Sequence, residues 1–536
     1  MSKLRLYIST ALHLKPSQIA YRVWRKVGGK TRLRLGHLPL PDPNAATISR
    51  IPVMPELDFD LAFLSRFDVD SIMENRIELL HHEEAVDWSA SWHEPLSTPL
   101  WRFNLHYCEY LLPLAKAYLD TGDTRYLDKG KAIIRSWIGS CPRARGGAAW
   151  DPYVISMRIV NWLAFYGELH VDLDRDSEFV GAFNQSLAEQ FVHLSQHLEK
   201  DLLANHYLEN LKALVILSCY FGDERMLDLV LPKLYGQVGE QILPDGMHFE
   251  LSPMYHKIVL EDLLRVATCL AAHGREADEV AKRLRLQDMC DCLWSLERNT
   301  DRTPLFNDSG DNVAKSRDAI LRCARKQFDI DPVCRDSLPD AGYYFLERQT
   351  EGGMVKVIFD AGMPGPEYAL GHAHCDALSF EAFLDGAPIV VNGGTFAYQD
   401  EARLSYKRTE AHSTTQVLGV EQSECWAPFR MAEHSRCKGR LLAGFRFEGT
   451  MVDQKGNRIT RTAELDEKGV LTVEDSVEPT CRIVSRVNLL KRVMSPEVQS
   501  ARYSPEFGME HRAVRFEKTE RGSVSTKVDL VSKSVA

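Results

Sequence analysis

Asn205 and His206 stand side by side at the point where an apolar stripe begins. Leu208 and Leu211 continue that stripe at helical spacing, so the pair is expected at the start of a helix. Asn is a preferred helix N-cap, and capping is the simplest interpretation of Asn205. An amide and an imidazole at a helix start are also well placed to hold a carboxylate, because the helix dipole favours negative charge there.

A loop from Asp245 to His256 is dense in titratable residues. Its Asp-Gly turn and its Ser-Pro pair predict that it leads into a helix. Taken singly, most of these residues are typical of surfaces and helix caps. Tyr255 and His256 are the better candidates for chemistry, because they lie just inside the predicted helix.

Two further clusters lie near residues 372 and 408. His372 and His374 are spaced i, i+2, so on the strand expected there both imidazoles point the same way. Such a pair suits a metal site, or a catalytic histidine with a structural neighbour. Arg408 offers a planar fork for an anionic sugar group, and His412 is a possible third metal ligand. Taken alone, the segment from Arg408 to His412 is more typical of an exposed, solvated strand rim.

These clusters fall on two different periodic patterns. From about residue 100 to 330, apolar residues recur at helical spacing and short Gly/Asp turns separate them, which predicts paired helices. From about residue 341, short alternating stretches turn at Asp385-Gly386 and Lys468-Gly469, which predicts an antiparallel sandwich or barrel. The expected fold class is therefore multidomain, α then β. The expected domains are an N-terminal helical extension at 1–95, a helical domain at 96–338 and a β domain at 339–536.

Bulk properties exclude several classes of protein. A chain of 536 residues is too long for one core, and its net charge of −10 argues against nucleic acid as a partner. A local basic cleft for an acidic substrate remains compatible with that charge. No apolar run approaches the roughly 20 residues of a membrane span. Twelve scattered cysteines and the lack of a clear signal peptide favour a cytoplasmic location.

Taken in order, the four clusters resemble the motifs of the heparinase II/III-like family, which includes heparin, heparan sulfate and alginate lyases. The matching stretches are Asn205-His206, Asp245 to His256, His372 to Phe380 and Arg408 to His412, with residues 101–107 as a further similar segment. The resemblance implies an incomplete (α/α) toroid followed by an antiparallel β-sandwich. It also implies β-elimination on a uronic-acid polysaccharide, and a cell-envelope location as the alternative to the cytoplasm.

The resemblance assigns a role to each candidate. Asn205 and His206 would neutralise the sugar carboxylate, since abstraction of the C5 proton builds up negative charge. Tyr255 would be the acid, or both acid and base in a syn elimination, and His372 the base or charge stabiliser. The expected substrate-binding residues are His256, Arg408, Tyr398 and Tyr406. No cofactor is required, although a structural zinc or calcium ion would be held by His374, Asn392 and His412.

Two departures from the family pattern leave other functions open. Asn392 stands where family members with a metal usually carry an aspartate, and Ser413 stands where they often carry an asparagine. One alternative is a glycoside hydrolase, which needs two carboxylates roughly 5–10 Å apart. The other is a non-catalytic carbohydrate-binding or assembly factor of bacterial surface-polysaccharide metabolism that keeps a lyase scaffold.

The lyase hypothesis predicts a geometry. Residues from the helical part and from the β part must meet in one cleft between the domains. His372 must lie within about 15 Å of Tyr255, because both groups act on one sugar.

Overall fold

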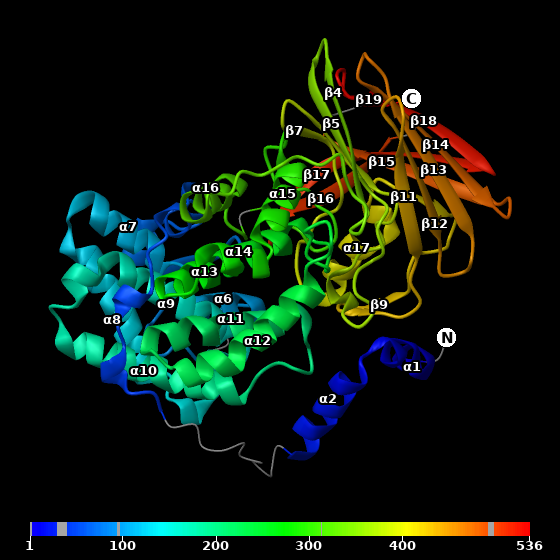
Figure 1. Cartoon of the computed structure of the whole chain (residues 1–536). Coiled ribbons are helices and arrows are strands. Elements are labelled where there is room, and N and C mark those ends of the chain that lie inside the picture. The colour runs from blue at the N-terminus through cyan, green and yellow to red at the C-terminus, as the bar shows by residue number, and fades with distance from the viewer. Residues whose placement is uncertain (1–2, 29–39, 94–96, 312, 491–497, 536) are drawn as a thin grey trace.

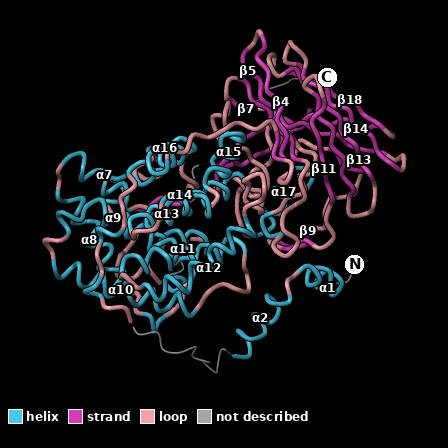
Figure 2. The backbone as a smooth tube through the Cα atoms, viewed as in Figure 1, coloured by secondary structure: helices cyan, strands magenta, loops and turns pink. Residues whose placement is uncertain are grey.

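The structure is a computed structural model that describes residues 3–28, 40–93, 97–311, 313–490 and 498–535. Helices dominate the first part of the chain and strands the second, which confirms the predicted order (Figure 1). Figure 2 shows most strands gathered at one end of the molecule and most helices at the other. The domain boundary predicted between residues 95 and 96 falls within 94–96, outside the described residues.

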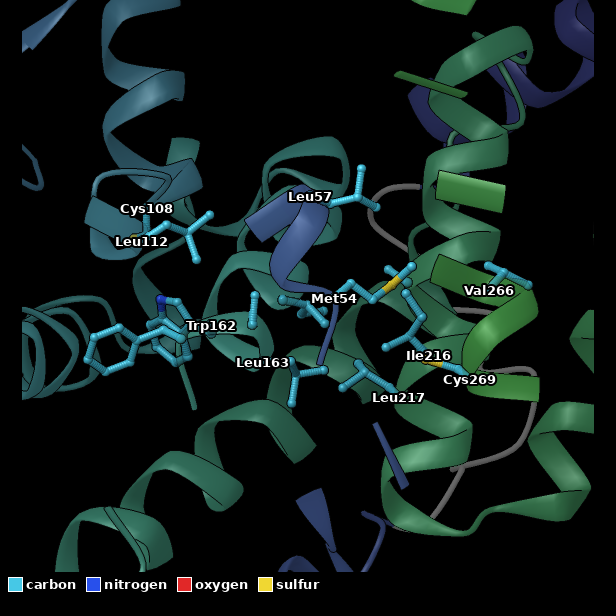
Figure 3. Packing of buried hydrophobic residues seen from close by; sticks show 14 of the residues in the cluster. Met54, Leu57, Cys108, Leu112, Trp162, Leu163, Ile216, Leu217, Val266 and Cys269 are labelled. Atoms are coloured by element: carbon cyan, nitrogen blue, oxygen red, sulfur yellow. The ribbon is translucent and has the colours of Figure 1, made fainter. Parts of the chain in front are cut away.

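The N-terminal part comprises an arm and a set of short elements. The arm consists of α1 (Lys3–His13) and α2 (Pro16–Gly28) and lies at the edge of the molecule (Figures 1 and 2). The short elements are α3 (Pro55–Asp58), α4 (Leu61–Leu64), α5 (Val69–Met73) and the hairpin β1 (Arg76–Leu79) with β2 (His82–Ala85). Figure 3 shows Met54, just before α3, beside Ile216 and Cys269. The segment around α3 therefore packs into the core of the helical domain.

Paired helices build the helical domain, as the periodicity predicts. They are α6 (Pro99–Tyr107), α7 (Leu111–Thr121), α8 (Thr124–Ser140), α9 (Pro152–Leu173), α10 (Ser177–Gln196), α11 (Ala204–Phe221), α12 (Glu224–Gln241), α13 (Pro253–Ala272), α14 (Ala277–Arg283), α15 (Leu286–Glu297) and α16 (Arg317–Phe328). Gly122 ends α7 in the left-handed region, and the Asp123 side chain accepts a hydrogen bond from the first turn of α8. Gly222 and Asp223 do the same between α11 and α12. No described helix is long and apolar enough to cross a bilayer.

The β domain is a sandwich of two antiparallel sheets. The larger sheet has the order β16-β17-β15-β7-β6-β5-β4-β3, with β8 also paired to β15, and the smaller has the order β11-β12-β13-β14-β18-β19. Side chains of both sheets meet in one core, where the rings of Phe359 and Phe447 stack 4.3 Å apart. The strands of the larger sheet are β3 (Ser337–Leu338), β4 (Tyr343–Thr350), β5 (Gly353–Asp360), β6 (Phe380–Leu384), β7 (Ala387–Val390), β8 (Thr415–Val417), β15 (Arg482–Leu489), β16 (Val498–Glu506) and β17 (Met509–Arg521). Those of the smaller sheet are β11 (Arg436–Leu442), β12 (Arg446–Val452), β13 (Arg458–Leu465), β14 (Val470–Glu478), β18 (Ser523–Asp529) and β19 (Ser534–Val535).

The hairpin turns lie where the turn residues predict them. Asp385 and Gly386 both have positive φ between β6 and β7, and Gly469 has a φ of 84° before β14. Between β7 and β11 the chain forms α17 (Asp400–Lys407) and the small hairpin β9 (Cys425–Ala427) with β10 (Arg430–Met431). These insertions lie on the side of the sandwich that faces the helical domain.

Candidate active site

A cavity of about 930 Å³ lies where the helical domain, the sandwich and the N-terminal arm meet. The helical domain contributes Asn205, His206 and Tyr255 to its lining, and the β domain contributes His372 and Tyr398. The rings of Tyr255 and His372 are 4.4 Å apart, well inside the limit of 15 Å that a shared sugar imposes. The structure therefore brings these five candidates together, as a single site requires.

Asn205 is not the N-cap of its helix, contrary to expectation. α11 already begins at Ala204, and the chain enters it through Leu203 and Ala204, which both have positive φ. Asn205 is 1% exposed, and neither its Oδ1 nor its Nδ2 has a hydrogen-bond partner. A buried amide without a partner costs free energy unless a ligand satisfies it. The amide is thus free to bind a group inside the cavity.

His206 lies beside this amide and is bonded to a carboxylate. Its Nδ1 donates to Oε1 of the buried Glu199 at 3.0 Å, and its side chain is 39% exposed toward the cavity. Burial lowers the pKa of His206, but the neighbouring Glu199 carboxylate outweighs that effect and raises it above its ordinary value. The cavity therefore contains an imidazole whose protonated form is favoured by Glu199, next to an amide without a hydrogen-bond partner, and this pair is suited to a carboxylate.

Tyr255 lies in the first turn of α13, as predicted. Ser252 caps this helix by accepting from the Tyr255 backbone N–H, and its hydroxyl also donates to the backbone oxygen of Asp308. The Tyr255 hydroxyl lies 2.6 Å from the hydroxyl of Tyr398. Burial, with the Asp308 charge nearby, raises the pKa of Tyr255 well above its usual range. Tyr255 is therefore a neutral phenol that has a proton to give.

The His372 imidazole is oriented by Asp308, a fully buried residue of the loop between α15 and α16. His372 Nδ1 donates to Asp308 Oδ2 at 2.7 Å, and His374 Nε2 donates to Asp308 Oδ1 at 2.9 Å. The Nδ1 proton leaves His372 Nε2 as an acceptor on a ring that lines the cavity. The two histidines are not on a strand as predicted, because His372 ends the short 3₁₀ helix Leu370–His372 and β6 begins only at Phe380.

Arg403 completes the surroundings of Asp308. From α17 it donates to Asp308 Oδ1 at 3.0 Å and to Oδ2 at 2.6 Å, and its side chain is 1% exposed. Burial alone would raise the pKa of Asp308, but Arg403 and the hydrogen bonds from both histidines hold it well below its ordinary value. Asp308 is therefore a permanent carboxylate that links the helical domain to the β domain.

The sequence did not single out Asp308 or Arg403, and it gave Glu250 no role in the elimination. Asp308 belongs to a short polar run after α15, whose only signal is its density of turn-forming residues. Glu250 is buried and lines the cavity, with its Oε2 unpartnered. Burial raises the pKa of Glu250, while His372 and His206 counteract that effect. Glu250 thus lies in the electrostatic field of both catalytic candidates.

Three predicted substrate-binding residues lie outside the cavity lining. His256 is fully buried, and its Nε2 contacts the backbone oxygen of Met289 at 3.0 Å. The Tyr406 hydroxyl donates to Glu510, and Arg408 is exposed just after the end of α17. Of the four predicted substrate-binding residues, only Tyr398 lines the cavity, and the substrate contacts of the other three stay predictions.

Three buried side chains that could hold a divalent cation lie close together outside the cavity lining. Ligand atoms of His374, Asp376 and His412 all lie within 4.8 Å of one another. His374 Nδ1 has no partner, and both ring nitrogens of His412 lack a well-formed hydrogen bond. Burial, followed by the neighbouring His374, lowers the pKa of His412 far below its ordinary value, so its ring is in the neutral form that metals bind. Two imidazoles and a carboxylate fit a zinc-type ion.

Asn392, the third metal ligand that the sequence predicts, has hydrogen bonds of its own. Its Oδ1 accepts from the Ser413 backbone N–H at 3.1 Å, and its Nδ2 donates to Ser379 Oγ. The amide therefore joins two segments of the sandwich, and its role as a ligand stays a prediction. Asp376, from within the H-x-H-x-D run, places a carboxylate beside His374 and His412.

Comparison with known proteins agrees with this architecture of a helical domain joined to an antiparallel sandwich, with a site at their junction. Residues 63–333 match the family model described as heparinase II/III N-terminus, and residues 331–531 match heparinase II/III-like, C-terminal. The chain belongs to the heparinase II/III family.

Two curated relatives are heparin-sulfate lyases. The one from Pedobacter heparinus is 24% identical over 352 residues, covering 58% of this chain and 51% of the relative. The one from Bacteroides thetaiotaomicron is 23% identical over 284 residues, covering 49% of this chain and 39% of the relative. The chain thus spans about half or less of the length of the curated relatives that it matches.

Solved structures show the same fold. Heparinase III matches with a TM-score of 0.69 at 14% identity, covering 95% of this chain and 91% of that structure. The heparan sulfate lyase HepC from Pedobacter heparinus matches with a TM-score of 0.54 at 18% identity, covering 95% and 87%. The helical domain is accordingly an (α/α) toroid, and the predicted fold class is confirmed.

Proposed function

We propose that this protein is a polysaccharide lyase that cleaves a uronic-acid-containing polysaccharide by β-elimination. The observation that carries the proposal is the unpartnered amide of Asn205 beside His206, whose pKa is raised by Glu199, in the same cavity as Tyr255 and His372. Abstraction of the C5 proton of a uronate places a second negative charge beside its carboxylate. An amide donor and an imidazolium held in place before the reaction would stabilise that charge.

The two proton transfers divide between His372 and Tyr255. His372 Nε2 accepts the C5 proton, because Asp308 holds the other ring proton on Nδ1. The C5–H electrons form the C4=C5 double bond as the C4–O4 bond breaks. The neutral Tyr255 phenol gives its proton to O4 of the leaving sugar, and the Tyr398 hydroxyl stabilises the phenolate that forms. The raised pKa of Tyr255 favours this division over a mechanism in which Tyr255 is also the base.

A divalent cation, when bound, would supply a structural cross-link. His374, Asp376 and His412 would hold it, and His374 would transmit its position to Asp308 through the Nε2 hydrogen bond. Both proton transfers take place on side chains outside this group.

A panel of uronic-acid polymers tests the proposal, with heparin-like, alginate-like and bacterial surface polysaccharides as its members. β-Elimination creates a conjugated double bond that absorbs ultraviolet light, and hydrolysis does not. Reducing ends without absorbance would indicate a hydrolase, and binding without either signal would indicate a carbohydrate-binding factor. Either result would overturn the lyase proposal.

Tyr255→Phe is the sharpest variant. It should lower kcat by about 10²–10⁴-fold while the melting temperature stays close to wild type, because only the acid proton is removed. Tyr344→Phe is the matched control, since its hydroxyl donates to the Gly439 backbone oxygen inside the sandwich. A fully active Tyr255→Phe protein would remove this phenol from the mechanism.

A further inference from the structure

The N-terminal arm differs from the rest of the chain in charge. Residues 3–28 contain six Lys or Arg and no Asp or Glu, whereas the other 510 residues contain 59 basic and 75 acidic side chains. A strongly basic segment on an acidic protein is typical of a part that meets an anionic partner. Two of these cations face the protein, where Arg5 lies 3.9 Å from a carboxylate oxygen of Glu424 and Lys15 pairs with Glu240. The lyase mechanism gives the remaining positive charge of the arm no role.

One face of the arm docks on both domains. The ring of Tyr7 packs against that of Trp426 at 4.9 Å, and the Trp426 indole N–H donates to Thr10. On the toroid side, the 1% exposed Gln18 donates to the Leu202 backbone oxygen at 3.2 Å, and Arg22 donates to that of Asp201. This inner face lines the cavity, so the arm has a defined orientation on the protein.

The opposite face of the arm is apolar and exposed. Leu4, Ile8 and Leu12 are 68%, 53% and 80% exposed and lie four residues apart, so they form one stripe along α1. Ile19 and Val23 repeat this spacing on α2, with exposures of 43% and 55%. Of the nineteen large hydrophobic side chains that are exposed in the described residues, seven lie between Leu4 and Trp24. Scattered exposed apolar residues are ordinary, but such a concentration marks an interaction surface.

We propose that the outer face of the arm binds the surface of an anionic phospholipid bilayer. Amphipathic helices that combine Lys and Arg with exposed Leu, Ile and Trp lie in the lipid interface, with the apolar stripe among the acyl chains and the cations at the headgroups. An anionic polysaccharide would account for the cations alone, because a hydrated glycan gives no reason for the leucine stripe. The inner face stays on the toroid and sandwich, so binding would hold the catalytic cavity next to the membrane.

Vesicle flotation with the full-length protein tests this proposal without any need for lyase activity. The protein should float with vesicles that contain phosphatidylglycerol and remain unbound with pure phosphatidylcholine, and added salt should weaken binding. The triple variant L4E/I8E/L12E should lose at least about tenfold in vesicle affinity, since each leucine or isoleucine that leaves the lipid forfeits more than that factor. Its melting temperature should stay unchanged, because these side chains are exposed.

A matched triple variant separates the loss of the apolar stripe from the general effect of adding three negative charges to the protein. Leu119, Val171 and Leu229 are exposed on the toroid at 49%, 62% and 48%, and L119E/V171E/L229E should bind vesicles like wild type. Equal losses in both triple variants, or no binding to phosphatidylglycerol vesicles, would overturn the proposal. Retention on heparin beads without flotation would overturn it too, and would assign the arm to the polysaccharide.

Discussion

Replacing Asp308 with Asn should uncouple the two domains at the active site. Four N–H groups donate to this buried carboxylate, one each from His372 and His374 and two from Arg403. An amide offers one acceptor oxygen, so the Arg403 guanidinium would lose its charged partner inside the protein. Breaking a buried ion pair costs about 3–5 kcal/mol, and the amide keeps some of the contacts, so the expected loss of unfolding free energy is about 3 kcal/mol.

Activity should fall for a separate reason. The single oxygen of Asn cannot accept from both His372 Nδ1 and His374 Nε2, which bind different oxygens of Asp308. In every molecule whose amide N–H₂ faces His372 Nδ1, the ring carries its proton on Nε2, which then has no lone pair for the C5 proton. A base held in the wrong tautomer loses on the order of 10²–10⁴-fold in kcat. Initial rates followed by ultraviolet absorbance, with urea denaturation to measure the free energy of unfolding, separate the two effects.

Asp475→Asn is the matched control. Asp475 binds Arg461 through two hydrogen bonds of 2.7 and 2.9 Å, deep in the sandwich and away from the cavity. This variant should lose a similar free energy of unfolding and keep a kcat close to wild type per folded molecule. A D308N protein whose kcat matches that of D475N would refute the role of Asp308 in holding His372.

Three other outcomes follow from the site and the arm. His206→Gln should lower the free energy of unfolding by about 0.5–1 kcal/mol at about pH 6 and by less at about pH 9. The sign follows from the raised pKa of His206 in the folded protein. The bond to Glu199 contributes its full stabilisation at pH values below the pKa of His206 in the unfolded chain. That contribution is lost as the pH rises through the pKa of His206 in the folded protein. Added Zn²⁺ should raise the melting temperature, by an amount equivalent to about 2.7 kcal/mol when its concentration is a hundredfold above Kd. The His412→Ala variant should show no such rise. An equal rise in both proteins would exclude this metal site. Gln18→Ala removes a hydrogen bond to the Leu202 backbone oxygen that is worth about 1 kcal/mol, so trypsin should cleave the arm faster. Unchanged cleavage would show that this bond does not hold the arm on the toroid.

The order of domains, the helix pairs and the hairpin turns could be predicted from the sequence because local signals specify them. Glycines at Gly122 and Gly469 and aspartates at Asp123 and Asp385 mark where elements end, and the structure has its turns at those places. The candidates Tyr255 and His372 were also accessible, because each lies in a dense motif. Their presence in one cavity follows from the fold and could only be expected through the family resemblance.

The residues that orient the site were hidden for a physical reason. Asp308 contacts His372 across 64 residues of sequence and Arg403 across 95, so no local spacing connects them. Asn205 looked like an N-cap, but the positive φ values of Leu203 and Ala204 move the helix start and leave the amide free. The i, i+2 spacing of His372 and His374 suggested a strand, whereas both rings are held by one carboxylate in a loop. At Asp308 and at the two histidines, contacts between residues far apart in the sequence decide the structure, and local spacing does not reveal them.

The ionic contact between Asp308 and Arg403 also constrains how such proteins diversify. Asp308 belongs to the toroid and Arg403 to the sandwich. A chimera that joins halves of two relatives must therefore match this ion pair as well as the packing around it. A mismatched junction would leave a lone charge in a dry interface and an imidazole without orientation. Domain shuffling in this architecture should therefore yield folded but inert hybrids unless the loop before α16 and the helix α17 are exchanged as one cassette.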